Sequence, residues 1–163
     1  MRKNNRRRRP SGVPFREESE VLVGVRSGDV WVAHLHRPTR GEVVRVEADA
    51  AWAWWREEQY GDLLGFYHTH PPRSGVAPSA TDEATMWRWV DALGRPLLCV
   101  IRSGSRTRST VFTRWNRPGI PAVRTIWIDR TTMVVVSDER VEIDQLLAAK
   151  AGEFVPESED PRP

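Results

Sequence analysis

The segment from residue 63 to residue 94 constrains the fold more than any other part of the sequence. Residues 63–70 (LLGFYHTH) form an apolar run that is typical of a buried strand. Residues 71–78 contain three prolines and one glycine, which predicts a loop. Ser79 then opens a predicted helix that runs to about Leu93 and ends at Gly94. The buried stripe of this helix is expected to consist of Met86, Trp89, Val90 and Leu93.

The remaining pattern predicts several short strands and two further helices. The 163 residues correspond to about one domain. This domain is expected to span residues 15–151, between a disordered basic tail (1–14) and a disordered acidic tail (152–163). The mixture of elements indicates an α/β or α+β domain, with one mixed β-sheet flanked by helices. Strands are predicted at residues 19–25, 29–36, 41–47, 96–103, 107–116, 125–129 and 133–137, and helices at 48–59 and 144–151.

The charge and the single cysteine limit the classes of partner and compartment. The net charge is +3, but six of the 25 basic residues lie within residues 1–9, so the rest of the chain is slightly acidic. Nucleic acid is therefore an unlikely partner. Cys99 is the only cysteine and lies in an apolar run, which excludes an intrachain disulfide and suits a reducing compartment. With no apolar run of membrane-spanning length and no signal-peptide pattern, we expect a soluble, cytoplasmic protein without a membrane partner.

The two histidines at the end of the 63–70 strand could bind a metal ion. Residues two apart on a strand point to the same side, so His68 and His70 present two imidazoles together. Asp82, in the first turn of the next helix, could supply a carboxylate, and such a ligand set suits zinc. A structural interpretation stands beside this one, because Ser79 and Asp82 also match a helix capping box.

A second His-x-His pair in the sequence serves as an internal control. His34 and His36 lie on another predicted strand, but no Ser-x-x-Asp follows them at loop distance. A His-x-His pair is therefore weak evidence on its own, and we interpret His34 and His36 as structural or surface residues.

The combined string resembles the JAMM motif of the JAB/MPN metalloproteases. This motif consists of an upstream glutamate, His-[Ser/Thr]-His-Pro, a loop and Ser-x-x-Asp, and the chain carries HTHP at 68–71 and SATD at 79–82. Eleven residues separate His70 from Asp82, where the family usually has ten. Counting back from Gly24, the upstream glutamate corresponds to Glu17, with Glu18 and Glu20 as alternatives.

The resemblance implies a cytidine-deaminase-like JAB/MPN domain and a role for each motif residue. His68, His70 and Asp82 would hold Zn²⁺, Glu17 would be the general base, and Ser79 would stabilise the oxyanion. Thr69 would be a packing residue.

The resemblance also implies an activity of the prokaryotic type. The protein would be a zinc metalloprotease or isopeptidase that uses a zinc-activated water to cut after the C-terminal glycine of a ubiquitin-like protein. It would thereby process precursors or remove conjugates, and activating or conjugating enzymes of the same pathway would be further partners. The alternatives are a non-catalytic MPN-like scaffold and a metal-dependent amide hydrolase with another substrate.

Overall fold

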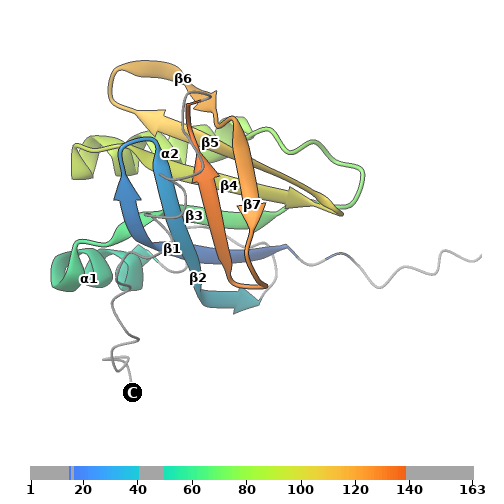
Figure 1. Ribbon diagram of the computed structural model, residues 1–163, viewed down its shortest axis with the longest axis horizontal. Helices are drawn as coiled ribbons and strands as arrows, with labels where there is room; N and C mark the ends of the chain where they lie inside the picture. Colours follow the sequence, from blue (N-terminus) through green and yellow to red (C-terminus); the bar gives the residue numbers. More distant parts are fainter. Residues whose placement is uncertain (1–14, 16, 41–49, 139–163) are drawn as a thin grey trace, which may run out of the picture.

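One mixed sheet of eight strands, accompanied by two helices, makes up the described part of the chain (Figure 1). The computed structural model describes residues 15, 17–40 and 50–138. The strand order in the sheet is β6-β5-β4-β3-β1-β2-β8-β7. The β3–β4 pair is parallel and the other described pairs are antiparallel. The elements are β1 (Glu18–Ser27), β2 (Val30–Arg40), α1 (Ala50–Tyr60), β3 (Leu63–Thr69), α2 (Ala80–Leu93), β4 (Leu97–Ser103), β5 (Arg106–Thr113), β6 (Asn116–Pro121), β7 (Arg124–Trp127) and β8 (Thr132–Val136).

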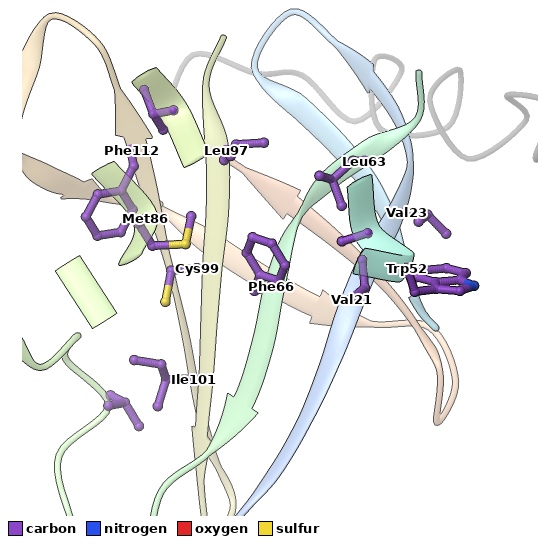
Figure 2. Close-up of a cluster of buried hydrophobic side chains, with 13 residues drawn as sticks. Val21, Val23, Trp52, Leu63, Phe66, Met86, Leu97, Cys99, Ile101 and Phe112 are labelled. Atoms are coloured by element: carbon purple, nitrogen blue, oxygen red, sulfur yellow. The ribbon is translucent and has the colours of Figure 1, made fainter. Parts of the chain in front are cut away.

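Both helices cover the same face of the sheet. Trp52 of α1 and Met86 of α2 belong to one buried cluster with Val21, Phe66 and Cys99 of the central strands (Figure 2). Helix α2 connects the two parallel strands β3 and β4, a connection that requires a crossover. The α2 crossover therefore holds the end of β3 and the start of α2 against one rigid core.

The opposite face is covered by the sheet itself, which curls until β7 meets β5. Figure 1 shows β7 and β8 crossing β3 and β4, and Val135 of β8 shares a buried cluster with Leu98 of β4. At the junction of β5 and β7, Trp127 Nε1 donates a hydrogen bond to Thr107 Oγ1 over 3.1 Å. The structure thus confirms a mixed α+β fold, with its two helices on one side.

Most of the predicted elements that lie within the described residues are confirmed, with one clear error. The predicted strand at 107–116 is wrong, because β5 ends at Thr113 and a further strand, β6, returns antiparallel to it. Pro118 and Pro121 weaken the strand signal of β6, but an edge strand tolerates proline because its outer side needs no donors. The predicted strand at 41–47, the helix at 144–151 and both predicted tails lie outside the described residues.

Neither helix of the described chain could cross a membrane. Helix α1 has 11 residues and α2 has 14. A helical span needs roughly 20 apolar residues.

Candidate metal centre

Strand β3 carries the His-x-His pair to the edge of the helix-covered face. His68 pairs with Ser19 of β1 and with Ile101 of β4, and its side chain is buried. Thr69 points to the other face, where its Oγ1 accepts a hydrogen bond from the Glu18 backbone N–H (2.8 Å). The backbone N–H of His70 donates to the Arg102 carbonyl (2.8 Å), which extends the β3–β4 pairing by one residue. Both histidines therefore sit on fixed backbone.

Helix α2 begins at a capping box that also fixes the candidate carboxylate. Ser79 is the N-cap, with the extended conformation (φ −74°, ψ 169°) that this position requires. Its Oγ accepts the Asp82 N–H at 3.2 Å, while Asp82 Oδ2 accepts the Ser79 N–H at 2.7 Å. The predicted structural interpretation of Ser-x-x-Asp is thus correct, and it leaves Asp82 Oδ1 free for another partner.

Three side chains, from the end of β3 and the first turn of α2, converge on one point. Nε2 of His68 lies 3.1 Å from Nε2 of His70 and 3.3 Å from Oδ1 of Asp82, and Nε2 of His70 lies 3.7 Å from Oδ2 of Asp82. Tetrahedral zinc, with bonds of about 2.0–2.1 Å, holds its ligand atoms about 3.3 Å apart. The spacing and the chemistry of the donor set therefore both fit a zinc ion, and His68, His70 and Asp82 form the group that could hold a metal.

The loop between β3 and α2 orients one of the two imidazoles. Nδ1 of His70 lies 2.8 Å from the Gly75 carbonyl oxygen. Because a carbonyl can only accept, Nδ1 carries the proton and Nε2 presents its lone pair to the candidate site. The neighbouring Val76 is buried in the helix-side core, and Ser103 Oγ donates to the Pro71 carbonyl (2.8 Å), so the loop is fixed at two points.

These loop contacts were not predicted from the sequence. The Gly75 group that contacts His70 is a backbone carbonyl, and a glycine in a Pro/Gly loop signals only a turn. His68 differs from His70, since its Nδ1 is buried and has no hydrogen-bond partner among the described residues. Packing, rather than a hydrogen bond at Nδ1, therefore holds the His68 ring.

The electrostatic environment favours an ionised carboxylate at the site. Burial alone would raise the pKa of Asp82, but the hydrogen bond and positive charge of His68 and the hydrogen bonds from Ser79 outweigh it. The net result is a pKa well below the ordinary value, so Asp82 is available as a negative ligand at neutral pH. Burial also raises the pKa of the nearby Cys99 thiol, and the charge of Asp82 adds to this rise.

The three candidate glutamates fall on different faces of β1. Side chains alternate along a strand, so Glu18 and Glu20 belong to the face opposite Ser19. Glu17 directly precedes β1, and the same alternation, continued by one residue, puts it on the helix-side face with Ser19. Burial raises the pKa of Tyr67 in the opposite core, and the charges of Glu20 and Glu18 raise it further, which agrees with this assignment. None of the three joins the group of donor atoms around His68, so the role of Glu17 as base stays a prediction.

The control histidines have structural contacts. His36 stacks on Trp52 of α1, with ring centroids 4.8 Å apart, and His34 Nδ1 lies 2.9 Å from Thr132 Oγ1. Neither belongs to the candidate metal group. The structural interpretation of this second His-x-His pair agrees with these contacts.

The fold and the donor group together define an α+β domain with a candidate divalent-metal centre, which lies where β3 ends and α2 begins. The chain belongs to the prokaryotic JAB-domain family, whose model, "Prokaryotic homologs of the JAB domain", matches residues 11–117. The matched segment contains every residue of the candidate centre. No curated protein matches the chain. Family membership is compatible with a metal-dependent hydrolase and with a non-catalytic MPN-like scaffold.

Proposed function

We propose that the protein is a zinc-dependent metallopeptidase that cuts after the C-terminal glycine of a ubiquitin-like protein, at an isopeptide or a peptide bond. The observation that carries this proposal is the convergence of His68, His70 and Asp82 at distances suited to zinc. A scaffold has no need to keep three metal donors oriented and one of them ionised. The complete ligand set therefore favours an enzyme.

In this proposal His68, His70 and Asp82 hold the ion. When bound, zinc would supply a Lewis acid that polarises the scissile carbonyl and lowers the pKa of a water to about 7. The Gly75 carbonyl keeps the proton of His70 on Nδ1, so that Nε2 remains a ligand. The capping hydrogen bond from the Ser79 N–H holds the Asp82 carboxylate in place.

The Ser79 hydroxyl has a hydrogen-bonding capacity that the cap does not use. In the capping box its oxygen accepts the Asp82 N–H, while its own O–H proton has no hydrogen-bond acceptor among the described residues. Ser79 is exposed at the N-terminus of α2, and it is hydrogen-bonded to the candidate ligand Asp82. It can therefore donate to the oxyanion that develops on the scissile carbonyl while it still caps α2.

Glu17 is the proposed general base. It directly precedes β1 on the helix-side face and is half-buried. From this position its carboxylate would take a proton from the attacking water and pass it to the leaving amine. Glu18 and Glu20, on the opposite face, serve as natural controls for its charge.

A set of variants with metal analysis tests the proposal. The full chain is loaded with zinc, and its cleavage of a ubiquitin-like protein fused through its C-terminal glycine to a reporter is measured. We expect Glu17→Gln to keep stoichiometric zinc and to lose cleavage by at least a hundredfold, because general base catalysis contributes roughly 10²–10⁴. His70→Ala should lose both zinc and cleavage.

Two controls make the outcome decisive. Glu18→Gln and Glu20→Gln remove the same charge from the other face of β1 and should keep both zinc and activity. Full activity in Glu17→Gln would move the base to one of these two residues. Wild-type protein that binds no stoichiometric zinc and cleaves no fusion would instead identify a non-catalytic scaffold.

A further inference from the structure

The positive charge of the described chain is concentrated in the part that follows α2. Residues 94–132 contain eight arginines and a single acidic residue, Asp129. The Asp129 carboxylate is used within its own turn, where Oδ1 accepts the N–H groups of Thr131 and Thr132, both at 2.8 Å. The arginines of β5 and β7 are therefore not neutralised by Asp129.

Two of these arginines lie in line with the metal centre across the sheet. His68 pairs with Ile101, and Ile101 pairs with Arg108, so the three side chains share one row on the helix-side face. Arg106 pairs with Ser103 on the same face, one row nearer to the end of the sheet. Neighbouring strands are about 4.8 Å apart, so Arg108 stands about 10 Å from His68, with one strand between them.

These arginines line a hollow that borders the metal-site loop. We name it the arginine hollow; its volume is about 380 Å³, and it is lined by Val76, Arg106, Arg108 and Arg124, together with small residues of β5, of β7 and of the link between β6 and β7. All three arginines are exposed, and no ion pair involves them within the described part of the chain. Val76 follows Gly75, whose carbonyl contacts His70. A ligand in the hollow would thus be in contact with the loop that orients the site.

We propose that the arginine hollow is a specificity site for an acidic segment of the polypeptide substrate. This inference rests on the proposed peptidase function and adds the chemical class of the substrate. Arginine guanidinium groups match carboxylates in planar, paired hydrogen bonds, and three of them here are free to do so. An extended chain advances about 3.3 Å per residue, so a 10 Å separation corresponds to an acidic residue about three positions from the scissile bond.

The composition of the hollow favours a polypeptide over a nucleic acid. Single-stranded nucleic acid is usually held by aromatic rings on which bases stack, and no aromatic side chain lines the hollow. Instead, the small apolar side chains of Val76, Ala122 and Val123 line the hollow together with the arginines. Such a surface suits a peptide that alternates acidic and small residues.

Peptide binding tests this inference independently of turnover. The full-length Glu17→Gln variant, loaded with zinc, is titrated against two fluorescent peptides that end in Gly-Gly. At the positions three and four residues before the last glycine, one peptide carries two glutamates and the other carries two glutamines. Fluorescence anisotropy gives the Kd of each peptide. We expect the glutamate peptide to bind about tenfold more tightly at low salt, and this preference to shrink at high salt because exposed charges are screened.

Three matched variants locate the effect. Arg106→Glu combined with Arg108→Glu should abolish the preference, and Arg108→Lys should keep most of it. Arg114→Glu, in the turn that follows β5, should leave the preference unchanged. Circular dichroism and Tm measurements establish that each variant is folded. Equal binding of the two peptides, or an unchanged preference in the double variant, would overturn the inference.

Two further results separate this inference from the proposed function. Tighter binding of a single-stranded oligonucleotide than of the glutamate peptide, lost in the same double variant, would contradict the inference and make the hollow a nucleic-acid surface. A glutamate preference in a protein whose wild-type form cleaves neither peptide nor fusion would support the inference on recognition while the peptidase proposal failed.

Discussion

Ser79 and Asp82 hold each other at the start of α2, and the same carboxylate faces the candidate metal centre. Oδ2 of Asp82 accepts the Ser79 N–H, while Oδ1 lies 3.3 Å from Nε2 of His68. One side chain thereby links the helix cap to the donor group. Because both functions depend on one carboxylate, only a change on the Ser79 side of the cap leaves the donor group intact.

Replacement of Ser79 separates its cap from its proposed catalytic role. Ser79→Ala should lower the free energy of unfolding by about 1 kcal/mol, since an N-cap side chain is lost. Ser79→Gly should cost only a few tenths of a kcal/mol, because glycine is also a good N-cap residue. If the hydroxyl stabilises an oxyanion, both variants should lose about 10²–10³ in kcat. Urea unfolding and turnover of the glycine-linked fusion measure the two effects.

Two outcomes of these measurements would contradict the proposed role of the Ser79 hydroxyl. Near-wild-type turnover in Ser79→Gly would leave Ser79 as a cap alone. Loss of bound zinc in the same variant would mean that the cap is needed to place Asp82, and the oxyanion assignment would then lack support.

Asp82 should make the metal-free protein sensitive to acid in a defined direction. Burial alone would raise its folded-state pKa, but His68 and Ser79 outweigh burial, so the pKa is lowered. A carboxyl whose folded pKa lies below its unfolded value stabilises the protein fully above about pH 4, and this stability is lost as the pH falls through the folded value. The free energies of unfolding of wild type and Asp82→Asn, measured in chelator, should therefore differ clearly at about pH 5. The difference should narrow in stronger acid, and a difference that grows from pH 5 downward would refute the assignment.

The local pattern around the site could be predicted from the sequence, while its supporting contacts could not. Alternation on a strand and the Ser-x-x-Asp cap are short-range rules, so they place His68, His70 and the start of α2 correctly. The contact of the Gly75 carbonyl with His70 depends on the conformation of an irregular loop. The Ser103 contact and the arginine hollow depend on which strands become neighbours across the sheet. Strand order is set by long-range packing, which has no signal in a short window of sequence.

The same distinction explains the error in the second half of the chain. Strand β6 contains Pro118 and Pro121, so its local propensity is low, and it exists because β5 offers it an edge to pair with. The order of elements alone also does not show that both helices cover one face, or that β7 and β8 close the other. That arrangement follows from the curl of the sheet and from the clusters that each face buries.

Gly65 should be required for the placement of β3. It has φ +150°, and a Cβ atom built on it would lie 1.9 Å from the Leu98 carbonyl oxygen of β4. Gly65→Ala must therefore push the parallel strands apart, and we expect a loss of about 2 kcal/mol or more in unfolding free energy. Zinc binding should weaken as well, since His68 lies three residues further along β3.

A second glycine supplies the control for Gly65. Gly28 also has a positive φ (+57°), but nothing lies within 4 Å of a Cβ atom at that position. Gly28→Ala should cost only the backbone strain of about 1 kcal/mol, with zinc binding unchanged. Equal destabilisation by the two substitutions would show that strain, and not the contact with Leu98, determines the need for Gly65.

Cys99 should be unreactive in the folded protein despite its position near the metal centre. Its side chain is 2% exposed, and burial, aided by the charge of Asp82, raises the pKa of the thiol. Since the thiolate is the reactive form, a thiol reagent at pH 8 should label native protein much more slowly than urea-unfolded protein. Asp82→Asn removes the smaller of the two causes and should leave the native rate nearly unchanged, because burial still excludes the reagent. Rapid labelling of native wild type would mean that the core beneath the site opens on the timescale of the assay, in which case β3 and β4 would not hold the histidines rigidly.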